Sequence, residues 1–468
     1  MSQPSSQLNT SAGLPSEIFK AYDIRGIVGS TLTPTIVESI GRAIGAEARA
    51  RGENAVLVAR DGRLSGPELI VALGRGLNRA GCDVIDIGRV PTPLLYFATH
   101  TLATRSGVML TGSHNPPEYN GLKIVIAGET LSGDAIQGLR QRILADDLGD
   151  GNGRSIHDDP RVAYLARILS DIKLARPLRI AVDCGNGVAG ELAPQLFRQL
   201  GCEVTELFCE IDGNFPNHHP DPANPENLKD LIAAVKRERL DVGLAFDGDG
   251  DRLGVIAPDG AIVWPDRQMI LYARDVLGRH PGAEIIYDVK CSRTLRAEIH
   301  KAGGKATMWK TGHSLIKAKL KETGALLAGE MSGHVFFKER WYGFDDGLYT
   351  GARLLEVLAR HPRPTREVFA SLPNTVNTPE LHLKLAEGEQ YALIKELAAK
   401  ASFPDAQLAT IDGVRADFAD GFGLVRASNT TPVLVFRFEG DNQQALEKIQ
   451  GRFRELLYSV RPNASLPF

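Results

Sequence analysis

The chain has 468 residues, of which 43% are hydrophobic and 24% charged, and its formal net charge is −3 at pH 7. This length exceeds what a single hydrophobic core serves, so we expect about three or four domains. The composition is that of a globular protein, and the near-neutral charge argues against binding to nucleic acid or to a membrane surface. An anionic substrate would have to be held by local basic groups.

Cysteine usage indicates a reducing compartment, and hydropathy predicts neither a transmembrane helix nor a signal peptide. The five cysteines are scattered and form no Cys-x-x-Cys pair, which argues against a disulfide framework and against a zinc site. The chain contains no run of about eighteen apolar residues, so we expect no transmembrane helix. Residues 1–13 lack the basic start and the apolar core of a signal peptide. We therefore expect a cytoplasmic protein.

Three consecutive strand-like segments recur three times along the chain in the same order. The first strands end in Asp and precede a helix-like segment, in Leu57–Ser65, Ile180–Gly187 and Ile285–Ser292. The second strands are Gly81–Ile87, Gly201–Leu207 and Gly304–Trp309. The third strands are Gly107–Thr111, Val242–Phe246 and Ala325–Ala328. Strands that alternate with helices in this way predict related α/β domains with parallel or mixed sheets.

The C-terminal region follows a different pattern. Its strand-like segments are Glu380–Leu385, a run around Val414, Gly423–Arg426 and Val433–Arg437, and its helix-like segments are Gln390–Ala401 and Asn442–Ser459. This order predicts a smaller α+β domain. The stretch 146–158, rich in Gly and Asp, is typical of a linker after the first domain. The predicted domains therefore span residues 1–158, 159–261, 262–373 and 374–468.

Each third strand leads into a polar loop of different chemistry. The loops are Thr111–Pro116, a cluster of aspartates that begins at Asp247, and Gly329–His334. Binding groups of open α/β sheets lie at the carboxyl ends of the strands, so we expect the three loops to converge on one cleft. The predicted fold class is α/β, with three related α/β domains, mixed sheets and a smaller α+β domain around a central active-site cleft.

The most informative segment contains Asp247, Asp249 and Asp251, separated by single glycines. Carboxylates this close raise one another's pKa unless a cation lies between them. Oxygen ligands favour a hard cation, Mg²⁺ or Ca²⁺. An EF-hand is excluded, because its sixth and twelfth positions hold Arg252 and Pro258 in place of Gly and Glu. The alternative is a solvated acidic turn.

Ser113 lies on a tight loop between Gly112 and the run that starts at His114. A serine on a rigid loop at a strand end can act as a nucleophile or carry a phosphoryl group, and the alternative is a plain turn. A Ser-His-Asp hydrolase fits poorly, because His114 is adjacent and no Gly-x-Ser-x-Gly motif is present. Lys123 follows closely. It is either an ordinary exposed lysine or, beside a metal-bound phosphate, an acid/base group or a positive charge that holds the phosphate.

Two later loops have groups suited to binding a phosphosugar. Arg426 begins a loop rich in hydroxyls and ending in Pro432, which predicts either an anion site or a polar hairpin turn. Glu330 and Ser332 suit recognition of sugar hydroxyls, and His334 suits proton transfer. The alternative for that loop is a polar turn.

Five ordered motifs then identify a family. They are Tyr22–Gly26, Thr111–Pro116, Asp247–Arg252, Gly329–His334 and Arg426–Pro432. From about Phe19 to the C-terminus the chain resembles the α-D-phosphohexomutases, and among them the bacterial phosphomannomutase/phosphoglucomutase group. Many members have Ala where Gly112 stands, and we expect this exchange of one small residue for another to matter little.

The resemblance implies a role for each candidate residue. Ser113 would carry the phosphoryl group, and it would bind one Mg²⁺ per chain together with Asp247, Asp249 and Asp251. Proton transfer and charge stabilisation near the reacting group would fall to Lys123, His334, Arg25 and Arg252. The sugar and its phosphate would be bound by Lys290, His313, Glu330 and Ser332. The non-reacting phosphate would be bound by Tyr22, Arg426, Ser428, Asn429 and Thr430.

The implied reaction interconverts hexose 1-phosphate and hexose 6-phosphate, for mannose and glucose. It would proceed through phosphoserine and a 1,6-bisphosphate intermediate, with glucose 1,6-bisphosphate as activator. The alternatives are a phosphoglucosamine mutase, a Mg²⁺-dependent sugar-phosphate phosphatase and a non-catalytic sugar-phosphate sensor. Met331 and the run Ser428–Thr430 weaken the phosphoglucosamine interpretation, since those relatives usually carry Gln and Ser-Gly-Thr there. We expect small phosphosugar partners only, and a monomer.

Overall fold

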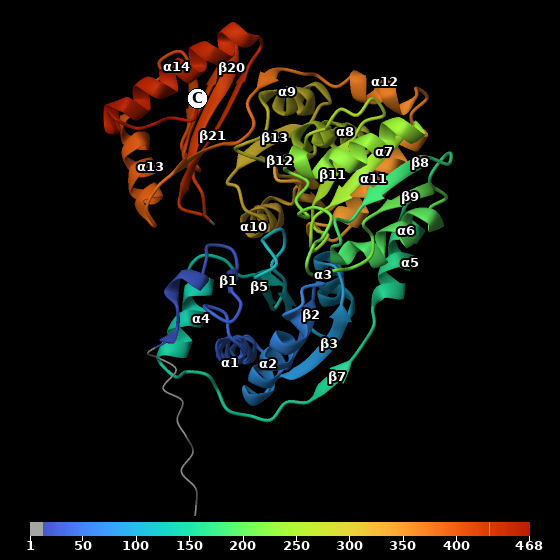
Figure 1. Cartoon of the computed structure of the whole chain (residues 1–468), viewed down its shortest axis with the longest axis vertical. Coiled ribbons are helices and arrows are strands. Elements are labelled where there is room, and N and C mark those ends of the chain that lie inside the picture. Colours follow the sequence, from blue (N-terminus) through green and yellow to red (C-terminus); the bar gives the residue numbers. More distant parts are fainter. Residues whose placement is uncertain (1–12, 430) are drawn as a thin grey trace, which may run out of the picture. The chain divides into compact units, whose positions relative to one another are not determined.

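The computed structural model describes residues 13–429 and 431–468, and the chain divides into two compact units. One unit contains the chain up to Ile262 together with Phe344–Arg360. The other contains Val263–Gly343 and His361–Phe468. The strands of the described ranges form four sheets, which lie two in each unit (Figure 1).

The first sheet has the strand order β1-β5-β4-β2-β3-β7, with β6 paired to β5. Its strands are β1 (Ile24–Ile27), β2 (Ala55–Arg60), β3 (Asp83–Arg89), β4 (Gly107–Leu110), β5 (Tyr119–Ile126), β6 (Glu129–Thr130) and β7 (Ser155–His157). The accompanying helices are η2 (Ser16–Ile18), α1 (Pro34–Ala50), α2 (Gly66–Arg79), α3 (Thr92–Thr101) and α4 (Asp134–Leu144). β2 pairs in parallel with β3 and β4, whereas β5 is antiparallel to β4, so the sheet is mixed.

The second sheet completes the first unit, with the strand order β11-β10-β8-β9. Its strands are β8 (Arg179–Asp183), β9 (Glu203–Leu207), β10 (Val242–Phe246) and β11 (Leu253–Ile256). The helices of this part are α5 (Arg161–Asp171), η3 (Val188–Glu191), α6 (Ala193–Gln199), η4 (Pro225–Leu228), α7 (Lys229–Glu238) and α11 (Gly347–Arg360). Although α11 comes much later in the chain, it packs against β11.

The third sheet, in the second unit, has the order β13-β12-β14-β15. Its strands are β12 (Glu284–Asp288), β13 (Lys305–Trp309), β14 (Leu327–Gly329) and β15 (Val335–Phe337). Its helices are α8 (Pro265–Arg279), α9 (Arg293–Lys301), α10 (His313–Thr323) and α12 (Thr365–Ala370).

The fourth sheet has the order β16-β21-β20-β19-β18, with β17 also paired to β21, and all of its pairs are antiparallel. Its strands are β16 (Val376–Asn377), β17 (Leu381–Lys384), β18 (Gln407–Ala409), β19 (Val414–Phe418), β20 (Gly421–Ala427) and β21 (Val433–Gly440). Its helices α13 (Glu389–Lys400) and α14 (Gln443–Val460) contact each other and pack on the sheet (Figure 1).

The internal repeat predicted from the sequence is confirmed by the topology. The orders β5-β4-β2-β3, β11-β10-β8-β9 and β15-β14-β12-β13 are the same order of fourth, third, first and second strand. The fourth strand of each set was not among the predicted strands. It returns antiparallel to the third strand directly after the polar loop, and β15 is only three residues long. The predicted α/β class with a smaller antiparallel α+β part is confirmed.

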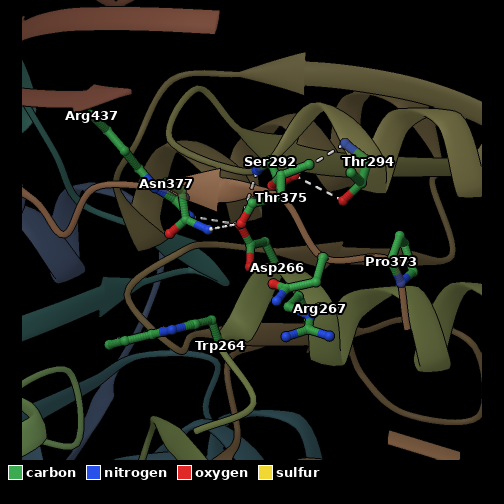
Figure 2. A pocket seen from close by; sticks show the side chains of 10 residues that line it. Trp264, Asp266, Arg267, Ser292, Thr294, Pro373, Thr375, Asn377 and Arg437 are labelled. Carbon is green, nitrogen blue, oxygen red and sulfur yellow. Dashed lines mark hydrogen bonds and ion pairs between the residues drawn. The ribbon is translucent and has the colours of Figure 1, made fainter. Parts of the chain in front are cut away.

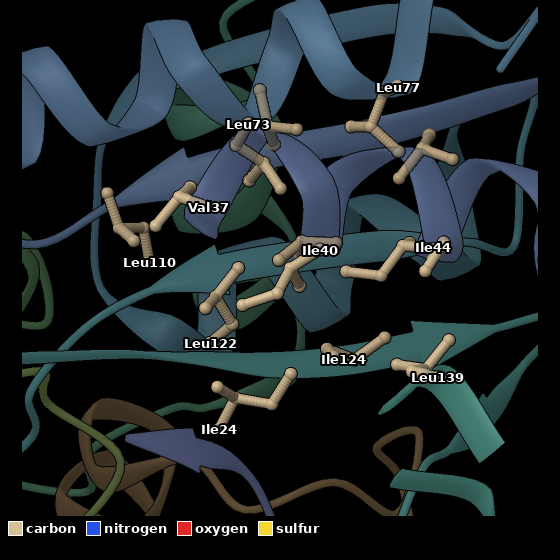
Figure 3. Packing of buried hydrophobic residues seen from close by; sticks show 14 of the residues in the cluster. Ile24, Val37, Ile40, Ile44, Leu73, Leu77, Leu110, Leu122, Ile124 and Leu139 are labelled. Atoms are coloured by element: carbon tan, nitrogen blue, oxygen red, sulfur yellow. The ribbon is translucent and has the colours of Figure 1, made fainter. Parts of the chain in front are cut away.

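The core of the first sheet shows how the sequence builds this architecture. The helix α1 begins at Pro34, where Thr33 accepts a hydrogen bond from the backbone N–H of Ile36. Its apolar residues recur at helical spacing and therefore face one side. Figure 3 shows this face packed between α2 and the sheet, through residues that include Val37, Ile40, Ile44, Leu73, Leu77, Leu122 and Ile124. Burying each such side chain stabilises the fold by roughly 1.5–3 kcal/mol.

In the described ranges, no helix combines the length and the apolar character that crossing a bilayer requires.

Asp346 provides a buried carboxyl group at the start of α11. It accepts hydrogen bonds from the Tyr164 hydroxyl at 2.9 Å and from the Tyr349 backbone N–H at 2.8 Å. Burial raises the pKa of Asp346 to about 7. In an unfolded chain, the same carboxyl group releases its proton near pH 4. Between about pH 4 and pH 7, the native state therefore holds a proton that the unfolded state has lost.

We expect Asp346→Asn to remove part of the pH dependence of stability. Because the carboxyl pKa is raised in the native state, its contribution is complete below about pH 4 and is lost as the pH rises towards about 7. Urea unfolding of wild type and variant should therefore diverge in favour of the variant across this interval. Asp259→Asn, at an exposed turn, is the control. A difference in urea midpoint that does not change with pH would contradict this assignment.

Candidate active site

Ser113 occupies an ordered and buried loop between β4 and β5. Its backbone lies in the left-handed region, with φ of 50°, and its side chain is almost completely buried. The Ser113 N–H donates to Thr111 Oγ1 at 2.7 Å, and the Ser113 hydroxyl donates to Asp247 Oδ2 at 3.2 Å. The serine hydroxyl therefore faces the first aspartate of the acidic cluster.

Asp247, Asp249 and Asp251 lie directly after β10 and are completely buried. One carboxylate oxygen from each lies within 4.8 Å of the others. The Asp249 Oδ1 atom is buried and accepts no hydrogen bond from the described residues. Burial excludes the solvated acidic turn. A cluster of close oxygen donors fits a hard divalent cation, with the Ser113 hydroxyl as an adjacent oxygen.

Two cations lie against this cluster. Lys123, on β5, donates from Nζ to Asp249 Oδ2 at 2.7 Å and to Asp251 Oδ2 at 2.5 Å. Arg252 donates its backbone N–H to Asp247 Oδ1 at 3.2 Å, and its Nε lies 3.7 Å from Asp247 Oδ2. Lys123 is buried, so the interpretation as an ordinary exposed lysine is wrong.

The pKa shifts follow from this packing. Burial and the charges of Asp251 and Asp249 raise the pKa of Asp247. Burial acts in the same direction on Asp249, but the nearby Lys123 ammonium outweighs it and lowers the Asp249 pKa. Burial would lower the pKa of Lys123, and the carboxylates of Asp249 and Asp251 raise it instead. Lys123 is thus held as a cation among the aspartates.

Close backbone contacts join the serine loop and the aspartate loop. A Cβ atom at Gly248 would lie 2.4 Å from the carbonyl oxygen of Ser113, so only glycine allows this approach. At the start of α3, Thr92 donates its N–H to the Asp249 carbonyl at 2.9 Å and its hydroxyl to Asp249 Oδ2 at 2.5 Å. The orientation of Asp249 is therefore determined by its neighbours.

Arg63 supports the serine loop through hydrogen bonds, and this role was not predicted from the sequence. Its side chain is completely buried and uses every N–H of the guanidinium. The acceptors are Asp61 Oδ2 at 3.2 Å and the carbonyl oxygens of Ser113, Asn115, Pro116 and Tyr119 at 2.6–2.9 Å. Asp61 also accepts from the Thr111 hydroxyl at 2.7 Å. The signal available in the sequence was the Asp-Gly-Arg run that directly follows β2.

The geometry leaves no room for a side chain at Gly112. A Cβ atom at Gly112 would lie 2.3 Å from Cζ and 2.4 Å from Nε of Arg63. The guanidinium passes directly under this residue, and a methyl group would displace it. In this chain, Gly112 is tied to the presence of Arg63.

Arg25, another predicted residue of this unit, contacts the serine loop. Arg25 forms an ion pair with Asp23 and donates from Nη1 to Asn115 Oδ1 at 3.3 Å. Tyr22 is half-buried. His114 lies 3.5 Å from Asp221, and burial lowers its pKa to about 4. His114 is therefore neutral at physiological pH.

In the second unit, Glu330 lies at the end of β14 and is buried. Its Oε1 accepts a hydrogen bond from the Gly312 N–H at 2.6 Å. Burial raises the pKa of Glu330. His313 and His334 are both buried, with ring centroids 5.6 Å apart. Ser332, in the same loop, is half-buried. The structure thus brings together the predicted sugar-binding carboxylate and both predicted histidines.

Carboxylates position two further predicted cations of this unit. Lys290 donates from Nζ to Glu380 at 2.7 Å, and burial is outweighed by this carboxylate, so the Lys290 pKa is raised. Arg426 donates from Nε to Asp412 Oδ2 at 3.0 Å. Both carboxylates were missed from the sequence, because neither belongs to a recognisable motif.

The last predicted loop is described in part. Ser428 donates its backbone N–H to the Val433 carbonyl at 3.0 Å, and its hydroxyl lies 3.0 Å from the hydroxyl of Thr431. Asn429 is half-buried. Thr430 lies outside the described residues.

A small pocket in the second unit shares no residue with the predicted site. Its lining includes Asp266, Arg267, Ser292, Asn377 and Arg437. Figure 2 shows Asp266 between Ser292, whose N–H donates at 2.9 Å, and Arg437, whose Nη2 donates at 3.0 Å. Arg437 also donates to the backbone carbonyl of Lys290. This ion pair therefore supports the segment that carries a predicted substrate-binding lysine.

Comparison with known proteins agrees with this architecture. Four successive models of phosphoglucomutase/phosphomannomutase match the chain: α/β/α domains I, II and III at residues 16–149, 162–260 and 264–376, and the C-terminal domain at residues 380–456. The chain is 58% identical to a phosphomannomutase/phosphoglucomutase of Pseudomonas aeruginosa, over 97% of this chain and 98% of the relative. It is 56% identical to a phosphoglucomutase of Neisseria gonorrhoeae, over 96% and 98% of the two chains.

A crystal structure of a family protein from Burkholderia thailandensis is 57% identical, with a TM-score of 0.93 over 97% of this chain and 100% of that chain. The chain belongs to the α-D-phosphohexomutase family, in its phosphoglucomutase/phosphomannomutase group, whose members are isomerases.

We expect Gly112→Ala to destabilise the protein by about 1–3 kcal/mol and to lower turnover, because the added methyl group displaces Arg63. In an Arg63→Lys background, the same change should cost at least about 1 kcal/mol less, since the thinner lysine leaves room. Unfolding and turnover of the two single variants and of the double variant give this coupling energy. Gly138→Ala, in α4 with nothing near its Cβ position, is the control. Additive effects would contradict the proposed contact.

Proposed function

We propose that this protein interconverts the 1-phosphates and 6-phosphates of mannose and glucose, with Ser113 as the phosphoryl carrier. The observation that carries the proposal is the placement of the Ser113 hydroxyl 3.2 Å from Asp247, at the edge of a buried cluster of aspartates. The fold does not require a nucleophile to be buried beside such a cluster. The arrangement suits phosphoryl transfer.

One Mg²⁺ per chain would be held by Asp247, Asp249, Asp251 and an oxygen on Ser113. When bound, the ion would offset the negative charge of the transferring phosphoryl group. The support for this assignment is the oxygen-only donor set and the buried Asp249 Oδ1. Lys123 and Arg252 would add fixed positive charge around the same group.

The phosphoserine would donate its phosphoryl group to the free hydroxyl of a hexose 1-phosphate. The O–P bond to Ser113 breaks, a new O–P bond forms at O6, and the proton of the hydroxyl passes to a nearby base. The 1,6-bisphosphate then turns end for end, and its other phosphoryl group returns to Ser113. His334 is the proposed acid/base group. Lys123, which was predicted as an acid/base group, is held as a cation by Asp249 and Asp251, so we propose it as a charge partner together with Arg25. Glucose 1,6-bisphosphate would act as intermediate and activator.

The second unit would recognise the substrate. Glu330 and Ser332 would bind sugar hydroxyls, and Lys290 and His313 would line the sugar and phosphate site. A separate phosphate site would use Tyr22, Arg426, Ser428, Asn429 and Thr430. The buried ion pairs of Lys290 with Glu380 and of Arg426 with Asp412 support these roles, because each holds a cation in one orientation.

Further assignments complete the proposal. The domains would span 1–158, 159–261, 262–373 and 374–468, and their loops would line one central cleft. We also propose a cytoplasmic monomer that acts on small phosphosugars. Both the 1-phosphate of mannose and that of glucose are expected substrates, since the two sugars differ only at C2.

Replacing the proposed carrier tests this function directly. Ser113→Ala should lower mutase turnover by a factor on the order of 10³ or more, because the variant lacks the hydroxyl that would carry the phosphoryl group. Active wild type should carry an added mass of about 80 Da that the variant lacks. Coupled assays with glucose 1-phosphate and mannose 1-phosphate, plus a trace of bisphosphate, measure turnover.

The exposed Ser170→Ala serves as the matched serine control. Release of inorganic phosphate as the main product would favour the phosphatase, and a preference for glucosamine 1-phosphate would favour the phosphoglucosamine mutase. Full activity of Ser113→Ala would overturn the phosphoserine mechanism.

The metal assignment has its own test. Asp249→Asn should weaken Mg²⁺ binding and reduce turnover by roughly 100-fold or more, because one anionic ligand is lost while the side-chain shape is kept. Calorimetric titration with Mg²⁺ and assays at limiting Mg²⁺ measure the two effects. Asp259→Asn, at an exposed turn, should leave both unchanged. Wild-type Mg²⁺ affinity and turnover in Asp249→Asn would sink the assignment.

A further inference from the structure

Two free cysteines lie side by side in the second sheet, outside the proposed mechanism. Cys184 follows the last residue of β8, and Cys209 lies two residues beyond the end of the parallel neighbour β9. The two Sγ atoms are 3.6 Å apart. A disulfide requires an S–S distance of about 2.05 Å, so a small movement would allow the bond to form.

The two thiols differ in their access to solvent. Cys184 is buried, whereas Cys209 is partly exposed. The Cys209 Sγ contacts the Leu207 carbonyl at 3.4 Å in addition to Cys184. A small oxidant can therefore reach Cys209 first, and Cys184 is placed to react with the product. This pairing of an accessible and a resolving thiol is typical of redox-sensitive sites.

The turn that follows Cys184 supports the loop of the aspartate cluster. The Cys184 carbonyl accepts from the Gly187 N–H at 2.7 Å, and the next N–H, from Val188, donates to the Gly248 carbonyl at 3.1 Å. Gly248 lies between Asp247 and Asp249. On the other side, the Asn186 N–H donates to the carbonyl of Phe208, the residue before Cys209. Backbone hydrogen bonds therefore connect the segments of both cysteines to the aspartate loop.

We propose that Cys184 and Cys209 form a reversible disulfide that slows the enzyme under oxidising conditions. A hydroperoxide oxidises the Cys209 thiol to a sulfenic acid, with the loss of one water molecule when hydrogen peroxide is the oxidant. The Cys184 sulfur then attacks the sulfenic sulfur, the S–S bond forms, and the hydroxyl leaves as a second water molecule. Closing the sulfurs displaces the Cys184–Val188 turn and, through it, Gly248. The effect on turnover rests on the proposed mutase function, but formation of the disulfide does not.

Mass spectrometry of the full chain tests the bond itself. Reduced protein is treated with hydrogen peroxide, unfolded with a thiol-blocking reagent and digested with trypsin without reductant. The expected product links the peptides Ile180–Arg198 and Gln199–Lys229, and the number of free thiols falls by two. Because the second peptide also contains Cys202, the Cys202→Ser variant must give the same link. A link through Cys202 or Cys291, or the absence of a link, would overturn the proposal.

Activity measurements test the switch. We expect peroxide to reduce wild-type turnover several-fold and dithiothreitol to restore it, with the same behaviour in Cys202→Ser. Cys209→Ser should resist peroxide, and its partly exposed position makes it the safer variant for folding; Cys184→Ser is the second. A disulfide that forms without a change in turnover would overturn the regulatory role. An inactive reduced wild type would instead count against the mutase function, while the peptide link would still test the disulfide.

Discussion

The repulsion among Asp247, Asp249 and Asp251 is the constraint on which the candidate site depends. Their oxygens lie within 4.8 Å of one another without exposure to solvent, an arrangement that is unfavourable unless positive charge is supplied. Lys123 supplies part of this positive charge through short ion pairs with Asp249 and Asp251, and Arg252 supplies a further part beside Asp247. A divalent cation and a phosphoryl group could both use this field, since it concentrates charge where a phosphate would be transferred.

Placing the serine against this cluster requires a rigid support. Arg63 provides this support by donating to four carbonyl oxygens of the loop around Ser113. Asp61 orients Arg63 by accepting a hydrogen bond from its Nε. The left-handed backbone at Ser113 is maintained by these bonds. Such pre-organisation matters for phosphoryl transfer, because its rate depends on position and electrostatics more than on covalent chemistry.

The second unit follows the same rule with different residues. Three of its buried cations are each held by a carboxylate, in the pairs Lys290–Glu380, Arg426–Asp412 and Arg437–Asp266. A buried cation with a fixed partner keeps one orientation, so it can present its remaining donors to an anion with little further ordering. The sequence identified Lys290 and Arg426 by resemblance, but their partners lie 90 and 14 residues away in the chain and belong to no recognisable motif.

The sequence by itself determined the repeated α/β order, the strand ends that carry Ser113 and the aspartates, and the family, because hydrophobic periodicity and short motifs are local properties. Tertiary structure alone decided the contacts between distant residues. Arg63 reaches the serine loop some fifty residues later in the chain, and its path leaves no room for a side chain at Gly112. Lys123 likewise reads as an ordinary surface lysine until packing places its ammonium beside two buried carboxylates. These outcomes depend on which side chains share a volume, and spacing along the chain does not specify that.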